Sequence, residues 1–252
     1  MEPVYTPVIA VARALFAAQG LKFTITGAGN IPTSGGAVLM INHLSYFDFA
    51  YAGLAAVPSK RLVRFMAKDA VFRHKISGPL MRGMHHIPVD RSAGAASFRA
   101  AVTALKAGEI VGVFPEATIS RSFELKGFKS GAVRMAQAAG VPVLPMIIWG
   151  SQRVWTKGHP KRLGRTNVPI TLSVGEPILA GRQENGDDVN SQIRARMTEL
   201  LHAAQEAYPA VPTDELKYLP ARLGGSAPTL EQATALDEGE AVRRAARRTA
   251  AG

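Results

Sequence analysis

The chain of 252 residues contains no cysteine, which excludes disulfide bonds, thiolate metal ligands and a cysteine nucleophile. Aromatic residues are scarce, at 7%, and no recognised nucleic-acid-binding module is present. No uncharged apolar run reaches the roughly 20 residues that a transmembrane helix needs. The longest runs, Pro3–Ala12 and Val141–Gly150, are both too short. The N-terminus also lacks the basic region of a signal peptide, because Glu2 stands where a lysine or arginine is expected. We therefore expect the protein to stay in the cytoplasm.

The balance of charges is strongly basic. Lys and Arg number 30 and Asp and Glu number 19, which gives a formal net charge of +11. Such a charge indicates an anionic partner, and nucleic acid, anionic lipid headgroups and phosphorylated metabolites all fit. A belt of basic residues that could face this partner consists of Lys60, Arg61, Arg64, Lys68, Arg73, Lys75 and Arg82.

Residues Val4–Gln19 predict an amphipathic helix, because their apolar side chains fall on one broad arc at 100° per residue. Such a helix either lies in a membrane interface or packs on its own domain, and the sequence leaves both possibilities open.

The rest of the chain alternates short apolar runs with helical patterns. Strands are predicted at Lys22–Thr26, Ala37–Ile41, Leu62–Ala67, Ile87–Val89, Ile110–Phe114, Val143–Trp149 and Ile170–Val174, and helices at Asp48–Ala56, Ala95–Lys106, Ser130–Ala139 and Val189–Ala207. This alternation predicts an α/β fold with a mixed, largely parallel central sheet flanked by helices. We expect a membrane-associating helix over residues 1–20, one catalytic domain over 21–207, and a partly irregular C-terminal extension over 208–252 with a basic tail.

The most informative segment is Asn42-His43-Leu44-Ser45-Tyr46-Phe47-Asp48, directly after an apolar strand. On a continuous helix His43 and Asp48 would point about 140° apart, and in a strand they would face opposite sides. They can meet only if the chain turns between them. Asp48 would then orient the imidazole, and His43 could take a proton from a bound alcohol.

Further segments strengthen the catalytic interpretation of His43 and Asp48. Gly83-Met84-His85-His86-Ile87-Pro88-Val89-Asp90-Arg91 comes next, followed by Phe114-Pro115-Glu116-Ala117-Thr118 and by Val141-Pro142-Val143-Leu144-Pro145. The ordered set resembles the glycerolipid acyltransferase family typified by 1-acylglycerol-3-phosphate acyltransferase. The blocks of that family look like Asn-His-x-x-x-x-Asp, Gly-x-Ile-x-x-x-Arg, Phe-Pro-Glu-Gly-Thr-Arg and Val-Pro-Ile-x-Pro.

The resemblance implies direct transfer of a fatty acyl chain from acyl-CoA or acyl carrier protein to the hydroxyl of a lysophospholipid, which gives phosphatidic acid in phospholipid biosynthesis. His43 and Asp48 would be the catalytic residues, and Ser45 would be a loop residue. The family needs neither a metal nor a cofactor beyond the acyl co-substrate. It also implies a peripheral protein on the anionic cytoplasmic face of the cell membrane, with no nucleic-acid partner.

The resemblance further implies that Arg91 and the third block hold the phosphate of the acceptor. Glu116, Thr118, Arg121 and Lys129 are the other candidates for acceptor binding. The sequence departs from the family in two places. Gly83 lies two residues earlier than the glycine of the second block, and Ile119 replaces the arginine of the third block, so that Arg121 or Lys129 would have to substitute.

Other readings remain open. The altered third block leaves glycerol 3-phosphate or another lysophospholipid as the acceptor. Less favoured readings are a basic nucleic-acid-binding protein, a lipid-binding relative without catalysis, and a hydrolase that uses Ser45. His85 and His86 are expected to be structural, because adjacent side chains rarely point into one metal site.

Overall fold

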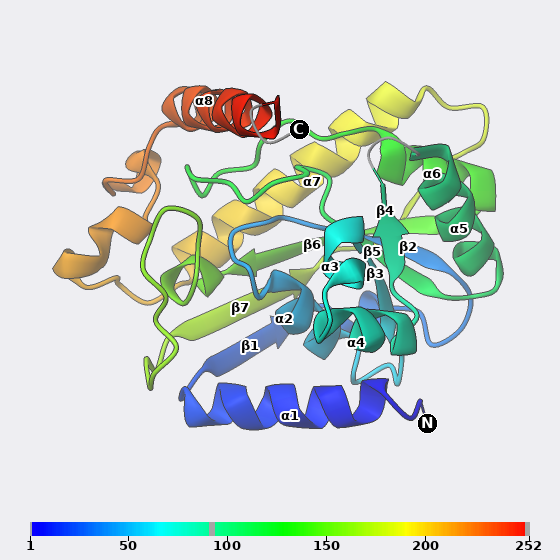
Figure 1. The fold of residues 1–252 in the computed structure, drawn as a ribbon, viewed down its shortest axis with the longest axis horizontal. Helices are drawn as coiled ribbons and strands as arrows, with labels where there is room; N and C mark the ends of the chain where they lie inside the picture. The colour runs from blue at the N-terminus through cyan, green and yellow to red at the C-terminus, as the bar shows by residue number, and fades with distance from the viewer. Residues whose placement is uncertain (1, 91–93, 250–252) are drawn as a thin grey trace.

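The computed structural model describes residues 2–90 and 94–249, which form one sheet covered by helices on both faces (Figure 1). The strands are β1 (Lys22–Thr26), β2 (Ala37–Ile41), β3 (Val63–Lys68), β4 (Ile87–Val89), β5 (Ile110–Val113), β6 (Pro142–Trp149), β7 (Pro169–Val174) and β8 (Ile178–Leu179). The helices are α1 (Tyr5–Ala18), α2 (Asp48–Ala55), α3 (Asp69–Arg73), α4 (Ser77–Gly83), α5 (Gly94–Lys106), α6 (Gly131–Ala139), α7 (Gly186–Glu206) and α8 (Leu230–Thr249). Short 3₁₀ turns complete the described chain.

The sheet has the strand order β1-β7-β6-β2-β5-β3-β4, with β8 paired to β6. The β1–β7, β6–β2, β2–β5, β5–β3 and β3–β4 pairs are parallel, whereas β7 and β8 run antiparallel to β6. This confirms the predicted mixed, largely parallel α/β fold. Because β2 and β5 are parallel neighbours, the segments that follow them leave the same edge of the sheet, where ligands of open α/β sheets bind.

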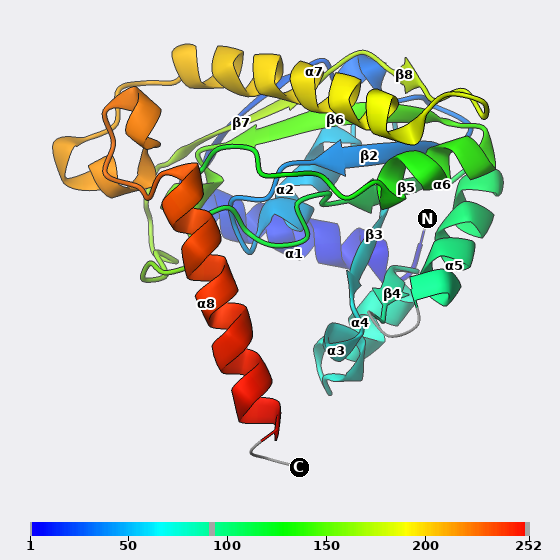
Figure 2. The same cartoon turned by 90° about the horizontal axis from the view of Figure 1, so that it is seen from above.

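Two apolar layers enclose the sheet. On one face Val38 and Met40 of β2 pack with α5, α6 and α7, and on the other face Leu39 and Ile41 pack with α1 and α2. Figure 2 shows α7 and β8 on one side of the molecule and α3, α4 and the end of α8 on the other. All five residues of β2 are buried, which explains why this strand is apolar without alternation.

Helix α1 packs on its own domain through one face and leaves a second apolar face open. The Tyr5 hydroxyl donates to the carbonyl of Val63 at 2.8 Å, and the Phe16 ring lies 4.9 Å from that of Tyr51. On the outer face Val11 and Leu15 are each 59% exposed. Within residues 2–90 and 94–249, no helix is both long enough and apolar enough to cross a bilayer.

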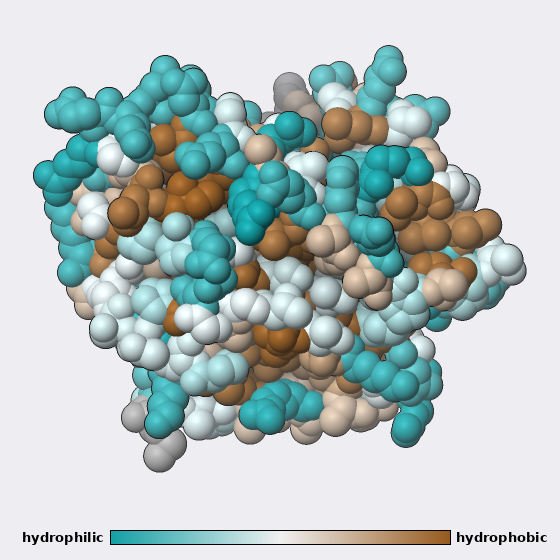
Figure 3. All heavy atoms as spheres, turned by 180° about the vertical axis from the view of Figure 1, so that it is seen from behind, coloured by the Kyte–Doolittle hydropathy of each residue, from teal (hydrophilic) through white to brown (hydrophobic). Residues whose placement is uncertain are grey.

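Figure 3 shows the molecule from behind the view of Figure 1. Hydrophobic residues on this face gather in separate clusters, divided by hydrophilic ones. The predicted basic belt likewise does not form one continuous surface. Arg64 is buried and binds Glu2, Glu109 and the carbonyl of Met84, so its charge serves the fold. The guanidinium of Arg61 donates to the carbonyls of Pro32 and Gly35.

Candidate active site

The chain turns directly after β2 and brings His43 against Asp48. His43 Nδ1 lies 3.0 Å from Asp48 Oδ2, although the two residues are five positions apart. The turn expected from the sequence is therefore present. It occurs between the end of β2 and the first residue of α2, which is Asp48.

Asp48 closes this turn through the same oxygen. Its Oδ2 accepts the backbone N–H groups of Leu44 at 2.6 Å and Ser45 at 2.7 Å. A carboxylate in the first turn of a helix is also favoured by the positive end of the helix dipole. The Asp48 side chain is fully buried, so the turn and the pairing with His43 depend on one carboxylate.

The imidazole of His43 is fixed in orientation but open on one side. Its ring stacks on Phe114, with the centroids 4.3 Å apart, and Phe114 follows β5 in the chain. With Nδ1 on Asp48 and 21% of the side chain exposed, the ring leaves Nε2 without a hydrogen-bond partner among the described residues. A neutral imidazole that donates from Nδ1 has a basic Nε2, which can accept a proton from an alcohol.

Two buried side chains hold the backbone of this loop. Glu116 Oε1 accepts the N–H of His43 at 2.9 Å, and its Oε2 accepts the N–H of Lys126 at 3.1 Å. The side chain of Asn42 exchanges two hydrogen bonds with the backbone of Ile148 in β6. Burial is the largest influence on Glu116 and raises its pKa to about 7.

Ser45 is buried inside the turn. Its hydroxyl is buried, donates to the carbonyl of Trp155 at 2.8 Å and accepts the N–H of Phe47 at 3.2 Å. Both bonds hold local backbone, which fits a loop residue and disfavours a nucleophile.

At two positions where the family blocks have glycine, this chain has another residue in a left-handed backbone conformation. His85 occupies the position two residues before Ile87 where the second block has glycine, and its φ is 55°. Ala117 replaces the glycine of the third block, and its φ is 59°. Both residues therefore adopt the left-handed conformation that is most accessible to glycine.

The other predicted site residues lie in different surroundings. Arg91 falls outside the described residues. Thr118 is half-buried, and Lys129 is exposed. The guanidinium of Arg121 binds Asp237 and Glu240 of α8. Ile119 is buried, so the position of the missing family arginine faces the interior.

His86 takes a structural role, as its position next to His85 suggested. It is buried beside β3, where its Nδ1 accepts the N–H of Phe65 at 3.1 Å. Burial, followed by the positive charge of Arg64, lowers the pKa of His86 to about 4. Among the described residues, no three His, Asp or Glu side chains are grouped so that they could hold a metal ion.

We expect the His86 side chain to make folding stability depend on pH. Because the folded pKa lies below the ordinary value of 6.5, the unfolded chain binds more protons between pH 6.5 and 4, and stability falls as the pH falls through this range. The full difference is on the order of 3 kcal/mol. Urea denaturation of the wild type and of His86→Gln at pH 4.5 and 7 measures it, with His202→Gln, at an exposed position of α7, as the control. An equal loss of stability on acidification in the wild type and His86→Gln would contradict this assignment.

Comparisons with known proteins agree on one family. The sequence model of the family described as Acyltransferase matches residues 22–149. The 1-acyl-sn-glycerol-3-phosphate acyltransferase of Bacillus subtilis (strain 168) is 31% identical over 200 residues, which cover 74% of this chain and 92% of that protein. A protein of the same name from Borreliella burgdorferi is 30% identical over 145 residues, or 55% of each chain.

The fold also matches a solved structure. The crystal structure of the 1-acyl-sn-glycerophosphate acyltransferase PlsC from Thermotoga maritima superposes with a TM-score of 0.67 over 81% of each chain, at 21% identity. At that identity the match shows a shared fold.

Proposed function

Because this chain belongs to the acyltransferase family, we propose that it transfers a fatty acyl chain to the free hydroxyl of 1-acylglycerol 3-phosphate and so forms phosphatidic acid. The acyl donor is a thioester, either acyl-CoA or acyl carrier protein, and no metal or other cofactor takes part. The observation that carries the proposal is the His43–Asp48 pair, in which 21% of the His43 side chain is exposed and Nε2 has no hydrogen-bond partner among the described residues. The names of the relatives support the choice of acceptor.

The proposed reaction has two steps. In the first step His43 Nε2 removes the proton of the acceptor hydroxyl, and the hydroxyl oxygen forms a bond to the carbonyl carbon of the thioester. Asp48 stabilises the resulting imidazolium through Nδ1. The tetrahedral intermediate then collapses, the C–S bond breaks, and the leaving thiolate takes the proton back from His43. Glu116 serves as a positioning residue, because both of its oxygens bind backbone N–H groups of the loop.

An assay of purified protein against a panel of acceptors tests this proposal. We expect the highest kcat/KM with 1-acylglycerol 3-phosphate. Transfer to glycerol 3-phosphate in preference would favour the second candidate, for which the buried Ile119 in place of an arginine is the supporting observation. No transfer from either acyl-CoA or acyl carrier protein to any acceptor would refute the function.

We also propose that the outer face of α1 rests on the anionic cytoplasmic surface of the cell membrane. The exposed Val11 and Leu15 would enter the interface. Replacing both with glutamate is expected to weaken partitioning into anionic vesicles about tenfold or more. Sedimentation with vesicles measures this, and Leu179→Glu is the control because Leu179 is 77% exposed on β8. Equal partitioning of Val11→Glu/Leu15→Glu and the control would exclude α1 as the contact.

A further inference from the structure

We call the turn from His43 to Asp48 the catalytic loop. A cluster of basic side chains on neighbouring segments is covered by two carboxylates of α8. Lys157 Nζ lies 2.8 Å from Asp237 Oδ1 and 2.7 Å from Glu240 Oε2. Lys126 Nζ lies 2.5 Å from Asp237 Oδ2. Arg121 lies 3.2 Å from Asp237 through Nε and 2.9 Å from Glu240 through Nη2. We call Arg121, Lys126 and Lys157 the cationic cluster.

The ion pairs of the cluster are partly shielded from water. Its three side chains are 14–20% exposed. The hydrogen bond from Lys157 is the largest influence on Glu240 and helps to lower its pKa to about 2. Burial opposes ionisation of Asp237, but the bonds from Lys126 and Lys157 outweigh it and lower its pKa. Both carboxylates are therefore charged at neutral pH.

The backbone that carries the cationic cluster is connected to the catalytic loop between His43 and Asp48. Arg121 follows Ser120, whose N–H donates to the carbonyl of His43 at 2.8 Å. Lys157 follows Thr156, whose hydroxyl donates to the carbonyl of Leu44 at 2.6 Å. The N–H of Lys126 binds Glu116, which in turn accepts the N–H of His43. The segments that carry the three basic residues therefore border the turn that carries His43.

The carboxylates of Asp237 and Glu240 together carry about the same charge as the phosphate of the proposed acceptor. A phosphate monoester carries about −1.5 to −2 charges at pH 7 and presents three strong acceptor oxygens. Asp237 and Glu240 together supply two negative charges through three oxygens. An arginine with two lysines is also a fitting ligand set for a phosphate, since the guanidinium can bind two oxygens at once.

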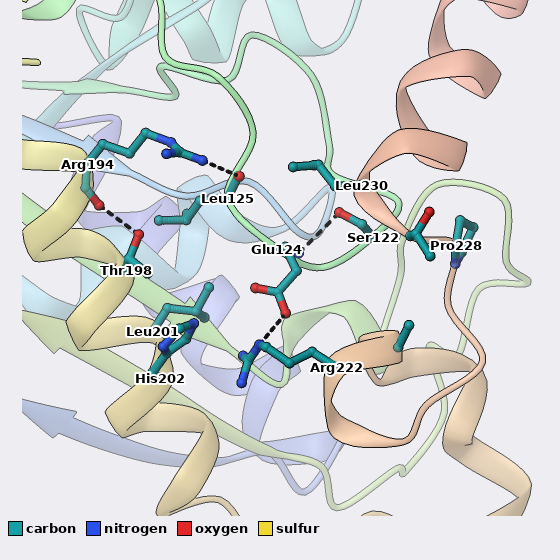
Figure 4. Close-up of a pocket in the computed structure, with 12 residues that line it drawn as sticks. Ser122, Glu124, Leu125, Arg194, Thr198, Leu201, His202, Arg222, Pro228 and Leu230 are labelled. Atoms are coloured by element: carbon teal, nitrogen blue, oxygen red, sulfur yellow. Dashed lines mark hydrogen bonds and ion pairs between the residues drawn. The ribbon is translucent and has the colours of Figure 1, made fainter. Parts of the chain in front are cut away.

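Most of the described side chains of α8 are exposed. Ala233 is buried, whereas residues 241–243, 245 and 246 are exposed. Figure 2 shows the second half of α8 extending away from the rest of the molecule. A pocket of about 380 Å³ lies beneath the start of the helix, between Ser122–Leu125, α7 and Pro228–Leu230 (Figure 4). An anion that competes for the same basic side chains can weaken the ion pairs of Asp237 and Glu240.

We propose that the cationic cluster is the subsite for the phosphate of the acceptor, and that α8 occupies this subsite through Asp237 and Glu240 until the phosphate displaces it. This proposal rests on the proposed function, since it names the residues that bind the acceptor of that reaction. It also explains how the chain binds phosphate without an arginine at position 119. The neighbouring Arg121 and two lysines from flanking loops supply the positive charge.

Two double variants with opposite charge changes test the proposal. Asp237→Asn/Glu240→Gln weakens the hold of α8 and is expected to lower the KM for 1-acylglycerol 3-phosphate severalfold. Lys126→Gln/Lys157→Gln removes two charged phosphate ligands and should raise the same KM about tenfold or more. The KM for the acyl donor should not change in either variant. Glu231→Gln/Glu238→Gln is the matched control, because both residues are exposed on the same helix.

A purely structural ion-pair network gives a different result. Both double variants would then lower the melting temperature without moving the acceptor KM in opposite directions, and that outcome would overturn the proposal. Calorimetric titration with glycerol 3-phosphate separates this inference from the proposed function, because it needs no turnover. Tighter binding by Asp237→Asn/Glu240→Gln than by the wild type supports the subsite even if no acyl transfer is found. Unchanged binding in a protein that does transfer acyl chains refutes the subsite alone.

Discussion

Replacing His43 with alanine is expected to lower kcat for acyl transfer by about 10²–10⁴-fold, which is the usual contribution of a general base. The alanine variant keeps the turn, because Asp48 still accepts the N–H groups of Leu44 and Ser45. We therefore expect the melting temperature and the KM for the acceptor to change little. Steady-state kinetics together with thermal denaturation measure both properties.

His202→Ala is the matched control for this variant, because it removes an exposed histidine from α7. It should retain full kcat. A His43→Ala enzyme with kcat within tenfold of the wild type would contradict the role of His43, whatever its stability.

Replacing Asp48 with asparagine is expected to lower kcat by about 10²–10⁴-fold with little change in the acceptor KM. The asparagine oxygen can still accept hydrogen bonds, but a neutral amide does not stabilise the imidazolium that forms when His43 takes the proton. Asp48→Ala should have the same kinetic defect and in addition lose stability. It leaves two buried N–H groups unpaired, at a cost of about 1–3 kcal/mol each.

Urea denaturation and steady-state kinetics of both Asp48 variants measure these effects. Asp69→Asn is the control, since Asp69 is also the first residue of a helix but pairs with Arg73 at the surface. Wild-type kcat in Asp48→Asn would show that the charge of Asp48 has no part in catalysis.

The central sheet could be predicted because its signal is local. The apolar runs of β1, β2 and β4 begin and end at the predicted residues, β5, β6 and β7 differ by one residue at one end, and β3 is shifted by one residue at both ends. Helices α3 and α4 were not predicted, since segments of 5 and 7 residues are too short to show a helical period. Helix α8 lies in the extension that was predicted to be partly irregular, because most of its described residues are exposed and no apolar period marks it in the sequence.

The catalytic pair could be predicted for a similar reason, because His43 and Asp48 lie in one short segment between a strand and a helix. The cationic cluster could not. Lys157 and Asp237 lie far in sequence from Arg121 and Lys126, and only the packing of two loops and α8 brings these side chains together. Conversely, the basic belt around Arg64 is evident in the sequence but does not form a binding surface there, because Arg64 pairs with Glu2 and Glu109 inside the fold.

The most direct measurement of the central claim, direct transfer assisted by one imidazole, follows labelled acyl thioester on the wild-type protein with and without the lysolipid. Intact-protein mass spectrometry and product analysis are read from the same samples. Direct transfer requires that the thioester is consumed only when the lysolipid is present and that the protein never carries an acyl group. An acyl adduct that forms without the lysolipid and passes its chain on when the lysolipid is added would contradict it.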